Sequence, residues 1–119
     1  MGETERITIG LVGPCKAGKS VLKSNLSGHD IRVRHIAQEH SYVQNMWQKI
    51  SNPDHLIFLD VSYETTLQRS NLKWTIEEYQ VQQDRLAHAR KHANLIIETD
   101  DLTPKQVKAI VLEYLSGIS

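Results

Sequence analysis

Residues 7–12 form a short apolar run, and the segment Gly-Pro-Cys-Lys-Ala-Gly-Lys-Ser at 13–20 follows it directly. The run predicts a buried β-strand, and the apolar positions within 21–26 predict the inner face of a short helix that Gly28 would stop. A strand, a glycine loop and a helix in this order begin a strand–helix–strand unit, whose strands are parallel. This segment alone therefore predicts an α/β fold.

The loop at 13–20 matches the pattern G-x-x-x-x-G-K-[ST] at every required position. Glycine permits backbone torsions that other residues resist, so consecutive N–H groups can turn toward one anion. Lys19 is then expected to reach the β- and γ-phosphates of a nucleotide, and Ser20 to coordinate Mg²⁺. A plain strand-to-helix turn would need neither side chain. The expected nucleotide-binding residues are Gly13, Pro14, Cys15, Lys16, Ala17, Gly18, Lys19, Ser20 and Val21.

Hydrophobic periodicity and capping patterns predict the remaining elements. Strands are expected at 31–36, 55–61 and 95–97, and helices at 38–50, 62–71, 75–92 and 103–116. Ser62 is expected to cap the second of these helices, Thr75 to begin the third with a capping box, and Thr103 to cap the last, with Pro104 at its first position. The inner face expected for the helix at 75–92 is Ile76, Tyr79, Leu86 and Ala93, and that of the last helix is Val107, Ile110, Val111, Tyr114 and Leu115. Strands that alternate with helices predict a three-layer α/β/α sandwich with a mostly parallel sheet of four or five strands, in one domain over 1–119.

Composition excludes several functional classes. The 14 basic and 14 acidic residues cancel, so no strong field favours nucleic acid or an anionic membrane. No stretch approaches the roughly 20 apolar residues of a membrane span, and the start of the chain lacks the features of a secretion signal. Cys15 is the one cysteine and cannot form an internal disulfide. We therefore expect a cytoplasmic protein without nucleic-acid or membrane partners, and the sequence leaves open whether it forms a homo-oligomer.

Asp60 lies near the end of the strand predicted at 55–61, and two interpretations of Asp60 stay open. It is either an aspartate that holds Mg²⁺ opposite Ser20, or a strand-end residue that caps the next helix. Arg69 lies on that next helix and is a candidate catalytic residue with Lys19, because arginine stabilises the charge of a transferring phosphoryl group.

Histidines and aromatic residues give weaker signals. His88 and His92 share a predicted helix face, and His35, Glu39 and His40 lie close together in the sequence. Two histidines without a carboxylate or cysteine ligand at fixed spacing rarely form a metal site, so ordinary helix residues are expected at His88 and His92. The segment from His35 to Tyr42 is expected to belong to a helix that Tyr42, Met46 and Trp47 stabilise. Met46, Trp47 and Trp74 form either core contacts or an exposed apolar patch at an interface.

Three segments together resemble the P-loop kinase superfamily, which includes the shikimate, gluconate, adenylate and dephospho-coenzyme A kinases. They are the loop at 13–20, the segment from Leu56 to Arg69, and the tail in which Ala-Asn-Leu-Ile-Ile-Glu-Thr at 93–99 precedes Leu-Thr-Pro. The resemblance covers about two-thirds of the chain and implies a P-loop NTPase fold, Mg·ATP as cofactor, and Arg69 as a residue of the lid side.

The chain also departs from that family. It lacks both the Asp-Gly-x-Pro-Arg-like segment and the arginine-rich lid that position the phosphoryl acceptor, and Asn94 replaces an acidic residue. The strings D-x-x-G and N-K-x-D of GTPases do not occur, which favours ATP over GTP. Two functions follow: a small kinase that transfers the γ-phosphoryl group of Mg·ATP to a small-molecule acceptor, or a non-catalytic nucleotide sensor or partner-docking module of the same fold.

Overall fold

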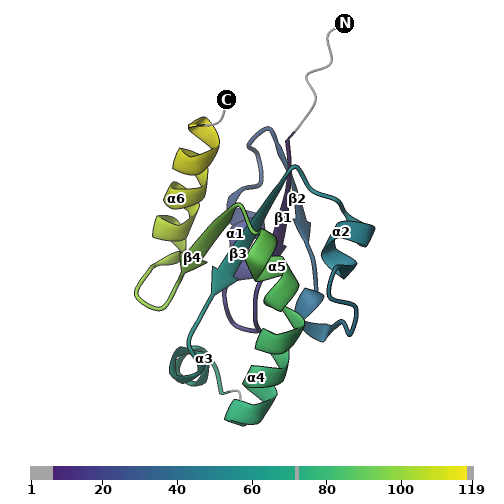
Figure 1. Ribbon diagram of the computed structural model, residues 1–119. Helices are drawn as coiled ribbons and strands as arrows, with labels where there is room; N and C mark the ends of the chain where they lie inside the picture. Colours follow the sequence, from purple (N-terminus) through teal and green to yellow (C-terminus); the bar gives the residue numbers. More distant parts are fainter. Residues whose placement is uncertain (1–6, 72, 118–119) are drawn as a thin grey trace, which may run out of the picture.

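The computed structural model describes residues 7–71 and 73–117, and its strands form one sheet. The elements are β1 (Ile7–Val12), α1 (Lys19–Asn25), β2 (Ile31–His35), the 3₁₀ turn η1 (Gln38–His40), α2 (Met46–Ile50), β3 (His55–Asp60), α3 (Tyr63–Arg69), α4 (Ile76–Arg85), α5 (Ala87–His92), β4 (Leu95–Glu98) and α6 (Pro104–Ser116). The strand order is β2-β1-β3-β4, and every pairing is parallel. Figure 1 shows all four arrows pointing toward α3 and α4.

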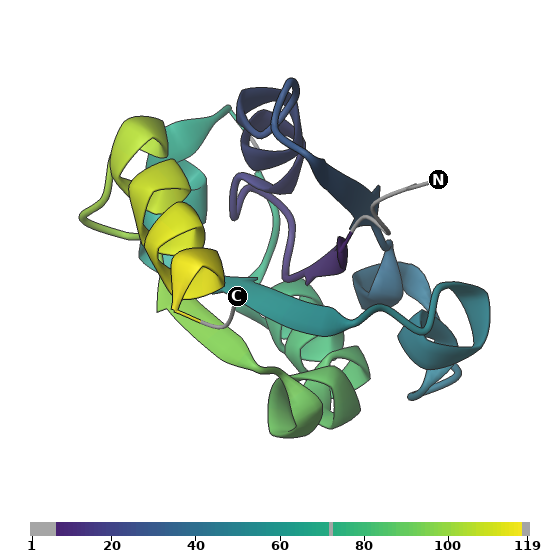
Figure 2. The same cartoon turned by 90° about the horizontal axis from the view of Figure 1, so that it is seen from above.

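Helices cover both faces of the sheet, as the three-layer prediction requires. Because side chains alternate along a strand, neighbouring residues of β3 enter different cores. Ile57 and Leu59 pack with α1 and α6, whereas Leu56 and Phe58 pack with α2 and the α4–α5 region. Figure 2 shows α1 and α6 on one side of the sheet and α5 on the other. The predicted α/β sandwich is confirmed, with four strands in the described chain.

The strand register brings four loops to one edge of the sheet. Val12 pairs with Phe58, Leu11 with His35, and Asp60 with Glu98. The loop at 13–20 leaves the central strand β1 at this edge, and η1 follows β2 at the same edge. Ligands of parallel α/β sheets bind at the carboxyl ends of the strands, so the sheet determines where a site is to be sought.

The single helix predicted at 38–50 is wrong. The chain instead forms η1, an irregular segment and α2. Gln38 explains the difference, because its buried side chain takes the place of helical hydrogen bonds. Its Nε2 donates to the carbonyl oxygen of Val43 at 2.8 Å, and its Oε1 accepts from the backbone N–H of Trp47 at 2.8 Å.

The helix predicted at 75–92 also differs, because it divides into α4 and α5 at Leu86. Leu86 lies in the core as expected, but the side chain of Ile76 is 48% exposed, so its place in the predicted inner stripe is wrong. The Thr75 capping box begins α4 as predicted. Thr103 forms a capping box on α6, with Pro104 in the first turn, again as predicted.

Both tryptophans are core residues, which answers the question left open for them. Trp47 donates from Nε1 to Nδ1 of His88 at 3.1 Å, and Trp74 donates from Nε1 to the hydroxyl of Thr66 at 2.9 Å. In the described ranges, no helix is both long enough and apolar enough to span a bilayer.

Candidate functional site

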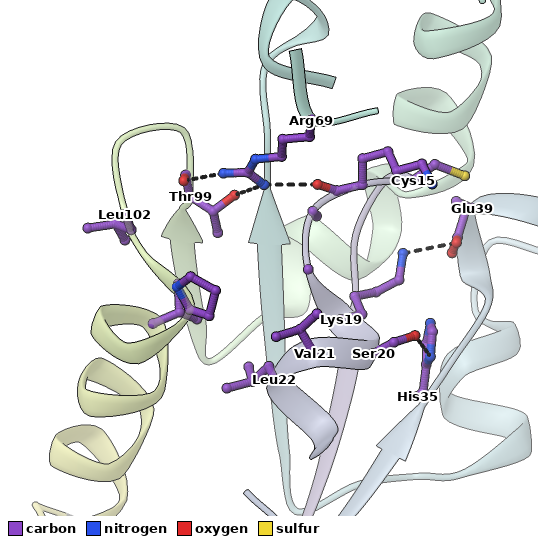
Figure 3. Close-up of a pocket in the computed structure, with 15 residues that line it drawn as sticks. Cys15, Lys19, Ser20, Val21, Leu22, His35, Glu39, Arg69, Thr99 and Leu102 are labelled. Atoms are coloured by element: carbon purple, nitrogen blue, oxygen red, sulfur yellow. Dashed lines mark hydrogen bonds and ion pairs between the residues drawn. The ribbon is translucent and has the colours of Figure 1, made fainter. Parts of the chain in front are cut away.

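A cavity of about 660 Å³ lies at the carboxyl edge of the sheet, beside the loop at 13–20. Residues 15–21 of the loop line it, together with side chains from β2, η1, α3 and the segment after β4. Figure 3 shows Lys19 and Ser20 on one side of this cavity and Leu102 on the other. The volume falls within the range of about 300–1,000 Å³ that is usual for small-molecule sites.

The glycines shape the loop for two different reasons. At Gly13, a Cβ atom would lie 2.1 Å from the carbonyl oxygen of Leu59, so only glycine lets the loop pass over β3. At Gly18, nothing lies within 4 Å of such an atom, but φ is +98°, which side chains disfavour. Lys16 also has a positive φ of 69°. The loop therefore depends on a close approach to β3 at Gly13 and on positive φ angles at Lys16 and Gly18.

Lys19 is buried and folds back over its own loop. Its Nζ donates to the carbonyl oxygens of Gly13 and of Pro14, the latter at 3.2 Å, and lies 2.9 Å from Oε2 of Glu39. Both side chains of this ion pair are nearly inaccessible, at 5% and 6% exposure. A buried ammonium group requires such partners, because an unpaired buried charge is costly.

Glu39 was named in the sequence analysis and assigned to a helix, and its place beside Lys19 was not predicted. It lies on η1, which follows the strand that pairs with β1, and Oε1 of its buried carboxylate has no hydrogen-bond partner within residues 7–71 and 73–117. A buried oxygen without a partner costs free energy unless a ligand satisfies it. The available signal was an acidic residue four positions after a strand, but the predicted continuous helix at 38–50 concealed it.

Ser20 contacts a histidine at the end of β2. Its hydroxyl lies 3.4 Å from Nδ1 of His35, as drawn in Figure 3, and both residues line the cavity. Burial, with a smaller contribution from the charge of Lys19, lowers the pKa of His35 below its ordinary value. The neutral imidazole is therefore favoured near pH 7, and its tautomer decides which group donates.

Arg69 reaches the cavity from the end of α3, as its candidacy requires. Its guanidinium donates to the carbonyl oxygen of Lys16 at 2.8 Å, to the hydroxyl of Thr99 at 3.0 Å and to the carbonyl oxygen of Thr99. Figure 3 shows the group lying between the loop and the end of β4. Three neutral oxygens accept its hydrogen bonds, and its charge also interacts with the carboxylate of Asp100.

Asp60 does not line the cavity. Its carboxylate forms an ion pair with Arg90 and accepts hydrogen bonds from the N–H of Val61 at 2.9 Å and from Nε2 of Gln83 at 3.1 Å. The cap of α3 is Ser62, whose side chain accepts from the N–H of Thr65. The predicted metal role of Asp60 stays a prediction, and it would require Asp60 to leave Arg90.

Comparison of the chain with models of protein families, and with curated protein sequences, found no match. The functional case therefore depends on the residues around the cavity.

Proposed function

We propose that this chain binds a magnesium nucleoside triphosphate, ATP in preference to GTP, through the loop at 13–20. The observation that carries the proposal is the buried Lys19 ammonium on a loop whose glycines have special backbone requirements, next to a cavity of nucleotide-compatible size. Lysine in this setting neutralises phosphate oxygens while the loop N–H groups bind them. Pro14, Cys15, Lys16, Ala17 and Val21 contribute through their place in the loop.

Binding would require Lys19 to exchange partners. In the present arrangement its charge is balanced by Glu39 at 2.9 Å. A β- or γ-phosphate in the loop offers the ammonium a stronger charge-assisted partner, and Lys19 would turn from Glu39 toward it. Both Glu39 oxygens would then be free.

The oxygen donors beside the loop fit Mg²⁺, which prefers carboxylates, water and phosphate oxygens. Ser20 offers a hydroxyl and Glu39 offers a carboxylate with one oxygen already unpartnered, and both residues line the cavity. We therefore assign the acidic partner of the metal to Glu39, whereas Asp60 is occupied by Arg90. The ion would supply charge neutralisation between the phosphates.

Transfer of the γ-phosphoryl group to a small-molecule acceptor is the activity that best uses the remaining residues. The bond between phosphorus and the β–γ bridging oxygen would break as an acceptor oxygen bonds to the phosphorus. Arg69 would then stabilise charge on the transferring group. Its guanidinium already lies against the loop at Lys16.

A non-catalytic nucleotide sensor or docking module is the second candidate. It is favoured by the cations of the cavity wall, which among the described residues are Lys16, Lys19 and Arg69. All three cations lie in or beside the loop, where they would contact the nucleotide phosphates. Among the described lining residues, no further lysine or arginine is left to bind a negatively charged acceptor. A sensor needs nucleotide binding and the exchange of partners at Lys19, but no acceptor.

Calorimetric titration with Mg·ATP, Mg·GTP and pyrophosphate tests the binding. Lys19→Met alone would leave the Glu39 carboxylate buried without its cation, which costs on the order of 3–5 kcal/mol of stability. The test protein is therefore the double variant Lys19→Met/Glu39→Gln, and Lys23→Met, an exposed lysine one turn along α1, is the control.

The double variant should bind Mg·ATP at least about 10- to 100-fold more weakly, because it loses a charge-assisted hydrogen bond worth about 1.5–3 kcal/mol. Lys23→Met should bind as the native chain does. Equal binding by the double variant, or no binding of any of the three ligands by the native chain, would contradict the proposal. ADP release that depends on an added acceptor then separates the kinase from the sensor.

A further inference from the structure

We propose that Cys15, Glu39 and His40 form a binding site for a divalent transition metal of the zinc class, beside the phosphate loop and distinct from the Mg²⁺ position at Ser20. A thiol or thiolate sulfur, a carboxylate oxygen and an imidazole nitrogen from these residues all lie within 4.8 Å of one another. Thiolate, imidazole and carboxylate together are a donor set typical of Zn²⁺, whereas Mg²⁺ takes oxygen ligands.

The separations suit one ion after a small contraction. Sγ of Cys15 is 4.0 Å from Nε2 of His40, and that nitrogen is 3.8 Å from Oε2 of Glu39. Zinc bonds of about 2.0–2.3 Å in a tetrahedron place ligand atoms about 3.3–3.6 Å apart. The two distances to His40 exceed these values by about 0.5 Å, and His40 can supply this movement because its side chain is 60% exposed. The Cys15 and Glu39 donor atoms lie within 4.8 Å of each other.

The surroundings favour ligand binding at the partly buried Cys15 and at the buried Glu39. Gln82, itself buried on α4, accepts from the backbone N–H of Cys15 at 2.9 Å and donates from Nε2 to Sγ at 3.1 Å. Such outer hydrogen bonds orient metal ligands and stabilise their charge. Oε1 of Glu39 is buried, has no hydrogen-bond partner among the described residues and is not the oxygen that pairs with Lys19, so this carboxylate can accept a further ligand.

The sequence could not reveal this grouping. Cys15 lies in the loop after β1, whereas Glu39 and His40 lie on η1, more than twenty residues later. Glu39 and His40 are neighbours in the sequence, and the parallel pairing of β1 with β2 brings the loop that carries Cys15 beside them. The exposed side of His40 leaves room for water as a fourth ligand, as in open zinc sites.

Because both sites use Glu39, a metal at the Cys15–Glu39–His40 site should affect nucleotide binding at the loop. This coupling rests on the proposed function, whereas metal binding itself does not. An ion on Glu39 would compete with Lys19 for the carboxylate and would hold it away from a Mg·nucleotide complex. Occupancy of one site should therefore weaken the other by the same factor.

Titration of the reduced full chain with Co²⁺, a spectroscopic substitute for zinc, tests the site. We expect a thiolate-to-metal charge-transfer band that saturates at one equivalent and disappears when Zn²⁺ is added. Cys15→Ser should abolish the band. His40→Gln, at an exposed position that puts folding at little risk, should weaken Co²⁺ affinity at least about tenfold.

His29→Gln is the matched control, because His29 is exposed and lies away from the triad. It should leave the titration unchanged. Absence of the band in the native chain, or an affinity that His40→Gln leaves unchanged, would overturn the site. Competition is read separately: if Co²⁺ binds but Mg·ADP does not lower its affinity, the coupling fails and the metal site stands.

Discussion

At the scale of single residues, Gly13 and Gly18 are glycines for two different physical reasons. A Cβ at Gly13 would overlap the backbone oxygen of Leu59, which cannot move without disturbing β3. A Cβ at Gly18 would enter open space and meet only the cost of a positive φ, about 1–2 kcal/mol. We therefore expect Gly13→Ala to lower the free energy of unfolding by more than Gly18→Ala.

Urea denaturation of the two variants measures this difference. Gly18→Ala should lose about 1–2 kcal/mol, and Gly13→Ala should lose more or fail to fold. Equal losses would show that the loop relaxes away from Leu59, and the described loop conformation would then be wrong.

Residue patterns predicted the cavity-lining Lys19, Ser20 and Arg69 from the sequence, but they did not predict their partners. The motif carries its lysine and serine at fixed positions because local backbone geometry requires them. Glu39 depends instead on an irregular segment held by the buried Gln38, and no local periodicity records such a contact. Asp60 is similar: its place at the end of a strand was predicted, but its ion pair with Arg90 was not.

At the scale of elements, the start of α3 is joined to the segment after β4 by Asp100. Its Oδ1 accepts from the backbone N–H of Ser62 at 2.8 Å. Partial burial acts to raise the pKa of Asp100, but hydrogen bonds from Ser62 and Thr65 and the charge of Arg69 outweigh it and lower the pKa below 3.8. The carboxylate therefore helps to hold the helix that carries Arg69.

Because this pKa is lowered by folding, the stability it contributes is complete above pH 3.8 and is lost as the pH falls through the lower folded value. Asp100→Asn should cost about 0.5–1 kcal/mol at neutral pH, a modest value because the group is largely exposed. The deficit should shrink below pH 3.8.

The prediction is checked by measuring the unfolding free energies of the native chain and of Asp100→Asn from pH 7 down to about pH 2.5. Asp101→Asn, at the next exposed residue, is the control and should change the pH profile less. A deficit for Asp100→Asn that stays constant through the acid range would exclude a role for its charge.

Element types followed well from the sequence where a single local signal decided them. Ser62, Thr75 and Thr103 cap their helices as the pattern predicts, since side-chain capping is a contact over three residues. Tertiary hydrogen bonds lie at both places where the predicted long helices were wrong. Next to the break at Leu86, the side chain of Gln38 donates to the carbonyl oxygen of Arg85 and that of Gln44 to the carbonyl oxygen of Asp84. Gln38 also holds the segment after η1.

At the scale of the whole molecule, the order of the strands makes the site. β1 lies between β2 and β3, so its loop is flanked by Glu39 and His35 on one side and approached by Arg69 from the other. The sequence predicts parallel strands but not this order, because neighbouring positions in a sheet are set by packing of the crossovers. The single domain and the cytoplasmic location stay predictions, and the oligomeric state stays open.

The most direct test of the account is to follow the backbone amide resonances of ¹⁵N-labelled protein while Mg·ADP, and separately pyrophosphate, are added. The account predicts that both ligands cause their largest amide chemical-shift changes at residues 15–21. Pro14 gives no signal because it has no amide proton. Pyrophosphate has no nucleobase or ribose, so changes that both ligands cause in the loop would report contact with phosphate alone. Unchanged loop resonances at saturating ligand, or largest shifts away from this loop, would contradict the assignment of 13–20 as the nucleotide phosphate site.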